Sequence, residues 1–423
     1  MLQTFRIAAG VAVLCLSTLS PAAEAESLAS RWDAQLTSHG AVIPFRLDIE
    51  GSGSSLTGTL FNGEQKQTTT SATLKDGVLT LDFAHYLTKI IASQKNGRLV
   101  GKVEGRFGGD SYVSFVPFEA KPYAPVTASA ANAPRINGLW EIPYESAKGE
   151  KAWRFIVRQN AAEVAATILR VDGDTGALTG HFQDGRFVLS HFDGARPLRL
   201  EVVPQDNGTL ELNLTGGVRS GKYTAVRTED ARAKGLPEPA DFVKHTTLRD
   251  PNEKFTFRFP DVGGNLVSSA DPKFRNKVVL AIITGTWCPN CHDEAQYLVQ
   301  LYRKYRDQGL EIVALDFEEP EQQDELQRVK AFTSKYGVEY TYLIAGAPAE
   351  MWEKVPQAIN LNTWPATFFV SRDGRVRKIH AGFAAPSSGE FHQQLKAEFT
   401  STIESLLAEH AAPELSESAG LRD

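Results

Sequence analysis

Hydrophobic and polar residues alternate in short segments through the first part of the chain. The pattern is clearest in residues 44–49, 55–61, 78–83, 99–104 and 112–117. Alternation with a period of two predicts β-strands that bury one face. Pairs such as Asp76-Gly77 and Asn96-Gly97 separate the segments and favour tight hairpin turns. We therefore predict an all-β sandwich or barrel over residues 28–120.

A second segment, residues 135–228, repeats this pattern after a linker rich in Ala, Pro and Ser. Four pairs of positions align the two segments, the first two displaced by 108 residues and the last two by 111: Trp32-Asp33 with Trp140-Glu141, Asp76-Gly77 with Asp184-Gly185, Asn96-Gly97 with Asn207-Gly208, and Tyr112 with Tyr223. Self-similarity of this kind predicts two copies of one β module. Because no cluster of titratable residues marks a site in either copy, we interpret the modules as scaffold or as a docking surface for a client.

The pattern changes after residue 250. Residues 278–283 and 310–317 are continuous apolar runs, which are typical of strands buried on both faces. Apolar residues three and four apart predict helices after the first run and over residues 321–336, 350–359 and 391–410. A hairpin around Asp373-Gly374 follows the third helix. The chain is thus predicted to be multidomain, with two all-β modules followed by an α/β domain over residues 250–410.

Two cysteines lie where the first buried strand becomes a helix. The chain has 3 cysteines, and Cys15 falls in the apolar N-terminal segment, which leaves Cys288 and Cys291. Backbone N–H groups and the helix dipole stabilise an anion at a helix N-terminus, so this position favours a reactive thiolate. The first cysteine can attack a disulfide and the second can resolve the mixed disulfide. The spacing therefore predicts a redox-active pair.

The N-terminus has the pattern of a secretory signal. Arg6 is followed by an apolar run to about Leu19 and then by an Ala-x-Ala exit, so we expect residues 1–25 to be a signal peptide. An uncleaved anchor is the alternative, although the run is short for a membrane span. Export predicts a periplasmic or otherwise extracytoplasmic location. Residues 411–423 are predicted to be a disordered tail.

The overall charge argues against two classes of partner. The net charge is −6 and the hydrophobic fraction is 42%. This balance offers no basic footprint for nucleic acid and no polybasic patch for a membrane surface. No stretch after the signal segment is long and apolar enough to cross a membrane.

The last 160 or so residues resemble the TlpA-like extracytoplasmic branch of the thioredoxin superfamily. The resemblance rests on a short set of features: Gly285-Thr286-Trp287-Cys288-Pro289-Asn290-Cys291, Glu294 three residues later, a helix inserted near residues 321–336, and Trp364-Pro365 before a strand. It implies a thiol-disulfide oxidoreductase without a cofactor or metal, which exchanges disulfides with protein thiols and with a redox partner that the sequence does not identify. The β modules lie outside the resemblance.

The resemblance also implies roles for eight residues. Cys288 would be the nucleophile, Cys291 the resolving thiol, Glu294 its proton acceptor, and Pro365 a cis-proline facing the cysteines. The substrate groove would be lined by four residues beside them: Trp287, Trp364, Pro289 and Asn290. Many thioredoxins bury an aspartate six residues before the first cysteine, but here that position is Ile282. Reductant, oxidant and isomerase all fit this pattern.

Other functions share parts of this motif. Cys288-Pro289-Asn290-Cys291-His292 also matches c-type haem attachment, which would make the protein an electron carrier. Zinc binding would need further Cys or His ligands at suitable spacing, and peroxidase chemistry would need a Pro and a Thr where Ala281 and Gly285 stand. A β-repeat binding or assembly protein with a vestigial redox domain is the non-enzymatic alternative.

Three charged or titratable residues near the cysteines have a less specific interpretation. We expect His292 to face solvent in the first helical turn. Glu318 and Glu319 follow the strand over residues 310–317, and we interpret them as part of a solvated acidic loop.

Overall fold

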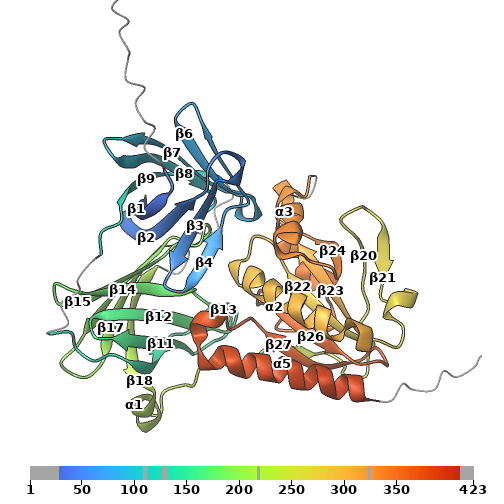
Figure 1. Cartoon of the computed structure of the whole chain (residues 1–423). Coiled ribbons are helices and arrows are strands. Elements are labelled where there is room, and N and C mark those ends of the chain that lie inside the picture. The colour runs from blue at the N-terminus through green and yellow to red at the C-terminus, as the bar shows by residue number, and fades with distance from the viewer. Residues whose placement is uncertain (1–27, 108–112, 126–131, 217–219, 323–324, 410–423) are drawn as a thin grey trace, which may run out of the picture.

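The protein is described by a computed structural model over residues 28–107, 113–125, 132–216, 220–322 and 325–409. The predicted signal segment, residues 1–25 with Cys15, and the predicted tail, residues 411–423, lie outside these ranges. Figure 1 shows three successive bodies: an N-terminal sheet, a barrel beneath it and an α/β body beside both.

The first sheet is an antiparallel meander. Its strands lie in the order β4-β3-β2-β1-β9-β8-β7-β6-β5, so the first strand, β1, pairs with the last strand, β9. The two outer strands, β4 and β5, are not paired with each other in that order, and the sheet curves as an open half-barrel. The strands are β1 (Ser30–Ser38), β2 (Ala41–Glu50), β3 (Thr57–Asn62), β4 (Gln65–Thr68), β5 (Ser71–Lys75), β6 (Val78–Phe83), β7 (Thr88–Lys95), β8 (Arg98–Gly105) and β9 (Ser114–Pro122).

The second sheet has the equivalent strand order but closes. The ring runs β11-β10-β18-β17-β16-β15-β14-β12 and returns to β11, with β13 paired to β12. The strands are β10 (Gly138–Pro143), β11 (Ala152–Asn160), β12 (Glu163–Arg170), β13 (Gly173–Asp174), β14 (Leu178–Gln183), β15 (Arg186–His191), β16 (Leu198–Pro204), β17 (Leu210–Thr215) and β18 (Gly221–Arg227).

The predicted repeat is confirmed by this shared topology. Trp32 and Trp140 are equivalent in detail, because each indole N–H donates to the carbonyl four residues earlier, at 3.3 and 2.9 Å. Asp76 and Asp184 both have positive φ, at 51° and 48°, in the turns that precede β6 and β15. Tyr112, the remaining anchor in the first copy, lies outside the described residues.

The α/β body contains a five-stranded sheet in the order β24-β23-β22-β26-β27. Strands β22 to β24 are parallel, and β26 and β27 form the predicted antiparallel hairpin. These strands are β22 (Val278–Thr284), β23 (Leu310–Phe317), β24 (Thr341–Gly346), β26 (Ala366–Val370) and β27 (Val376–Ala381), and short pairs are made by β19 (Thr247–Leu248), β20 (Arg258–Pro260), β21 (Leu266–Ser268) and β25 (Ala358–Ile359). The helices are α1 (Thr228–Ala233), α2 (Pro289–Tyr305), α3 (Gln327–Tyr336), α4 (Met351–Lys354) and α5 (Glu390–Ala408).

Both faces of β22 are buried, as its continuous apolar run predicts. Leu280 and Ile282 pack with α2 and α5, whereas Ala281 and Ile283 pack in a separate core on the other face. The helix predicted over residues 321–336 begins late, at Gln327, because Leu326 is left-handed with φ 51°. The helix predicted over 350–359 ends at Lys354, because Val355, the residue before Pro356, leaves the helical conformation with φ −128° and ψ 61°.

The β modules pack against the α/β body. In Figure 1, α5 begins beside the barrel and α3 lies beside the first sheet. Lys335 of α3 donates to the carbonyl of Thr68 at 2.6 Å, and Arg154 of the barrel lies 5.1 Å from the Phe391 ring in α5. Among the described helices, none is long and apolar enough to cross a membrane.

Candidate functional site

Cys288 caps the N-terminus of α2. Pro289 occupies the first helical position, and the Cys291 backbone N–H donates to the Cys288 sulfur at 3.3 Å. The Cys288 thiol in turn donates to the Trp364 carbonyl at 3.5 Å. Both cysteines are unpaired thiols, with 4% of Cys288 and 1% of Cys291 exposed. The predicted strand-to-helix junction therefore brings the pair to a covered site.

The Cys291 thiol is enclosed and holds its proton tightly. Burial raises the pKa of its thiol well above the usual value, and its interactions with Cys288 raise it further. A hydrogen bond with the Gly285 backbone and one with the Thr284 side chain lower the pKa of this thiol and oppose the rise. At neutral pH this thiol keeps its proton unless a base removes it.

Glu294 lies one helical turn after Cys291 and is 1% exposed. Burial raises its pKa to about 8, while a 2.6 Å hydrogen bond from the Thr367 hydroxyl opposes the rise. A carboxyl group with this pKa can take up or release a proton near neutral pH.

The Trp364–Pro365 peptide bond is cis, as the resemblance implies. The Pro365 carbonyl accepts a hydrogen bond from Gly382 at 2.7 Å, which holds the turn against β27. Trp364 packs edge-on against Trp287 with ring centres 5.2 Å apart, and the Trp287 indole donates to the Phe317 carbonyl at 2.9 Å. The two indoles thus form one wall beside Cys288.

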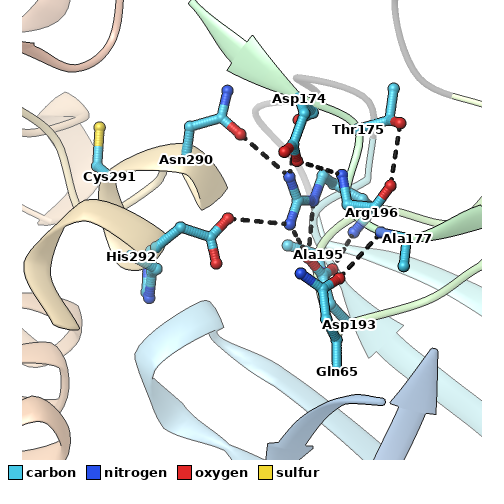
Figure 2. Close-up of polar contacts among 12 residues, drawn as sticks. Gln65, Asp174, Thr175, Ala177, Asp193, Ala195, Arg196, Asn290, Cys291 and His292 are labelled. Atoms are coloured by element: carbon cyan, nitrogen blue, oxygen red, sulfur yellow. Dashed lines mark hydrogen bonds and ion pairs between the residues drawn. The ribbon is translucent and has the colours of Figure 1, made fainter. Parts of the chain in front are cut away.

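Asn290 is held by the barrel. Its amide donates to the Asp172 carbonyl at 2.9 Å, and Arg196 donates to its side-chain oxygen at 3.2 Å. Figure 2 shows Arg196 reaching from the barrel toward the first turn of α2, where it also lies 3.6 Å from Asp293. A side chain between the two cysteines is therefore anchored by a different module.

The prediction that His292 faces solvent is wrong. The residue is 1% exposed, and the Tyr86 ring of the first module packs against the His292 ring, tilted by 32° with ring centres 4.2 Å apart. Its Nε2 lies 2.7 Å from the Thr286 carbonyl and its Nδ1 lies 3.0 Å from the Tyr336 hydroxyl. Burial lowers the pKa of His292 to about 3. Both ring nitrogens are occupied by hydrogen-bond partners, which leaves neither in a position to serve as an axial haem ligand.

The interpretation of Glu318 as part of a solvated loop is also wrong. Its side chain is fully buried and accepts from the Thr286 N–H at 3.0 Å and from the Thr286 hydroxyl at 2.8 Å. Arg328 of α3 donates to the other carboxylate oxygen at 3.0 Å. Burial raises the pKa of Glu318 and Arg328 opposes this shift. The Glu318–Arg328 ion pair therefore links the loop before Cys288 to α3. The sequence feature that could have predicted a role for Glu318 is its position at the carboxyl end of a parallel strand.

A cavity of about 350 Å³ lies over Cys288. All four residues predicted to line the groove, Trp287, Pro289, Asn290 and Trp364, are in its wall. A larger cleft, of about 1130 Å³, lies between the two β modules and has no cysteine in its wall. Within the described ranges, no group of three or more His, Cys, Asp or Glu residues is arranged to hold a metal ion.

Comparison with known proteins agrees with this geometry. The AhpC/TSA family matches residues 251–379, which contain both cysteines and Pro365 but none of the two β modules. Thiol-disulfide oxidoreductase ResA of Geobacillus kaustophilus (strain HTA426) is 30% identical over 151 residues, which are 36% of this chain and 80% of that protein. ResA of Bacillus anthracis is 31% identical over 135 residues, 32% of this chain and 71% of that protein.

Among solved structures, a thiol:disulfide interchange protein of the thioredoxin family from Chlorobium tepidum TLS is similar to 38% of this chain and to 100% of its own chain. Its sequence identity is 21% and its TM-score is 0.29.

Proposed function

The chain belongs to the ResA-like family of thiol-disulfide oxidoreductases, and from this premise we propose that Cys288 and Cys291 carry out the exchange. In the direction that oxidises the protein, the Cys288 thiolate attacks a substrate disulfide and releases one thiol. Cys291 then attacks the Cys288 sulfur, releases the second thiol and leaves a Cys288–Cys291 disulfide. The observation that carries this proposal is the Cys288 sulfur at the N-cap of α2, within hydrogen-bond distance of the Cys291 N–H.

Glu294 is proposed as the proton acceptor for Cys291. Because the Cys291 thiol has a raised pKa, the resolving step needs a base, and Glu294 is the buried carboxyl group one turn away on the same helix. The Thr367 hydroxyl positions this carboxyl group. Since Thr367 lies two residues after Pro365, the same short segment would position both the cis-proline and the base.

The proposed role of the β modules is to control access to Cys288. Tyr86 of the first module and Arg196 of the second contact residues of the first turn of α2. We also propose an extracytoplasmic location, because of the signal peptide predicted in residues 1–25. The haem alternative has less support, since the side chain that would act as ligand, His292, is enclosed.

Two cysteine variants test the exchange mechanism with 5,5′-dithiobis(2-nitrobenzoate), which releases a coloured thiol. The wild-type protein should release two equivalents and end as an internal disulfide. C291S should release one equivalent and keep a mixed disulfide that intact-mass measurement detects, and C288S should lose the rapid phase. Release of two equivalents by C291S would show that the two-cysteine mechanism is wrong.

The direction of electron flow is read from the reduction potential of the pair. Equilibration against glutathione should separate an oxidant, at about −120 mV, from a reductant, at about −270 mV.

A further inference from the structure

The hairpin of β12 and β13 extends from the barrel to the α/β body near Cys288. Arg170 pairs with Gly173, so Val171 and Asp172 form a two-residue turn at the tip of this hairpin. Both tip residues are buried, with 1% of Val171 and 7% of Asp172 exposed. In Figure 1, β13 lies on the side of the barrel that faces α2. The turn of a hairpin, which is usually at the surface, is therefore covered by another body of the protein.

The α/β body binds the backbone of this tip. The Asn290 side chain donates to the Asp172 carbonyl at 2.9 Å. Gly173, the next residue of the hairpin, forms a parallel β-bridge with Phe383. Pairing of this kind, in which one segment adds to the backbone of another, recognises an extended chain with little dependence on its side chains.

The surface that binds the hairpin adjoins Cys288. Gly382, which precedes the bridged residue, donates to the Pro365 carbonyl at 2.7 Å. The carbonyl of Trp364, one residue before that proline, accepts from the Cys288 thiol at 3.5 Å. Asn290 follows Cys288 by two residues in α2. The hairpin therefore occupies a surface next to the reactive sulfur, where a polypeptide substrate has to bind during exchange.

Glycines allow the two backbones to approach this closely. Gly173 has φ 124°, and a Cβ added to it would lie 2.6 Å from the Phe383 carbonyl oxygen and 2.6 Å from the Asn290 amide nitrogen. A Cβ added to Gly382 would overlap the Val171 carbonyl oxygen. Because a Cβ does not fit at such separations, a side chain at either position would push the hairpin away from the α/β body.

The first module has the equivalent hairpin without this contact. The displacement of 108 residues maps Val171-Asp172 onto Gly63-Glu64, which form the tip between β3 and β4. Gly63 and Glu64 are both exposed. The fold of the module therefore does not require a buried tip, and the burial of the second copy comes from its contact with the α/β body.

We propose that the surface formed by Asn290, Gly382 and Phe383 binds an extended polypeptide segment of a protein client, and that the barrel hairpin occupies this surface until the client displaces it. This inference rests on the thiol-disulfide exchange proposed above and assigns it a substrate class and a mode of regulation. A small disulfide needs only the cavity of about 350 Å³ over Cys288, whereas an extended client has to replace the backbone contacts of the hairpin.

Amide hydrogen exchange tests the displacement with the hairpin sequence unchanged. C291S, which should stop at the mixed disulfide, is loaded either with a peptide of about ten residues that has one central cysteine or with 2-mercaptoethanol. The fragment that spans residues 163–178 should exchange at least tenfold faster in the peptide adduct, because the displaced hairpin loses its bridge to the α/β body. The fragment that spans residues 55–70 contains the hairpin of the first module and should exchange equally in both adducts.

A matched pair of glycine variants tests the effect on rate. G173A places a methyl group against Phe383 and Asn290 and should release the hairpin. G185A places a methyl group in another hairpin turn of the barrel, with φ 80° and no atom within 4 Å, and so controls for backbone strain. Oxidation of the reduced protein by the disulfide-linked dimer of the same peptide is compared with oxidation by bis(2-hydroxyethyl) disulfide.

The ratio of the peptide rate to the small-disulfide rate should rise at least tenfold in G173A and stay unchanged in G185A. The reason is that a docked hairpin reduces the apparent affinity for the peptide to the fraction of molecules in which the surface is free. An unchanged or lower ratio in G173A, or equal exchange of residues 163–178 in the two C291S adducts, would overturn the displacement and leave the exchange mechanism standing. The comparison of adducts does not depend on the folding of G173A. A reduced wild-type protein that neither disulfide oxidises would overturn the exchange mechanism itself.

Discussion

Replacing Glu294 by Gln tests the most specific chemical assignment in the site. If Glu294 accepts the proton of Cys291, the resolving step should depend on the fraction of this carboxyl group that is ionised. With a pKa of about 8, roughly a tenth of the molecules carry the carboxylate at pH 7. The rate of the resolving step should therefore rise about tenfold per pH unit below pH 7 and level off above pH 8. Loss of a general base typically costs ~10²–10⁴-fold in rate, so E294Q should be at least a hundredfold slower in this step at pH 8.

The assay separates the two chemical steps. In stopped-flow mixing of the reduced protein with excess 5,5′-dithiobis(2-nitrobenzoate), the first release of coloured thiol reports attack by Cys288. The second release reports attack by Cys291 and is independent of reagent concentration. Measuring the second rate from pH 5.5 to pH 9.5 gives the pH dependence of the resolving step, and its midpoint gives the pKa of the base.

Thr367→Val is the matched control for this assignment. It removes the hydroxyl that lowers the pKa of Glu294 but keeps the carboxyl group and nearly the same side-chain shape. In this variant the rate of the resolving step should reach the same maximum as in the wild type, but at higher pH. In E294Q the rate should not reach that maximum. A second phase in E294Q with the wild-type rate and pH dependence would refute the role of Glu294.

Two further predictions concern the supports of the site. E318Q leaves buried Arg328 with only the partly exposed Glu319 as a carboxylate partner, and it should lower the free energy of unfolding of the α/β body by about 3 kcal/mol, measured by urea denaturation with tryptophan fluorescence. E319Q, which removes the partly exposed partner, should cost less than about 1 kcal/mol, and equal effects would show that burial does not decide the cost. R196A removes the contacts of Arg196 with Asn290 and Asp293 of α2 and should speed alkylation of Cys288 by a bulky maleimide at least tenfold. R186A, in an exposed ion pair elsewhere on the barrel, should not change this rate, and an unchanged rate in R196A would show that the Arg196 contacts do not restrict access.

Local patterns predicted the parts of the fold that local physics determines. The run over residues 278–283 has no polar position, and β22 is covered on both faces as a result. Alternation identified the β modules, although β1, β4, β5 and β7 of the first module were missed as separate strands. Strand β5 has a mostly exposed burial pattern and presents no apolar face that alternation could detect. The positions of the cysteines were predicted correctly because a strand followed at once by a helix leaves little conformational freedom to the residues at their junction.

The contacts between modules could not be predicted from the sequence. His292 is buried by Tyr86, which precedes it by more than 200 residues, and Asn290 is held by Arg196 from another module. Periodicity assigns a residue to a face of its own helix but does not say which distant segment covers that face. The wrong expectation for His292 follows directly from this limit.

The position of these contacts bears on whether the β modules are spacers. A spacer has no reason to contact the two residues on either side of Cys291 in α2. Here Asn290, between the cysteines, is bound by the barrel, and His292, immediately after the second cysteine, is covered by the first module. The two modules, which share a strand order, thus contact the same helical turn. Both contacts lie within one turn of the reactive thiols, and this position supports the proposal that the β modules control access to Cys288.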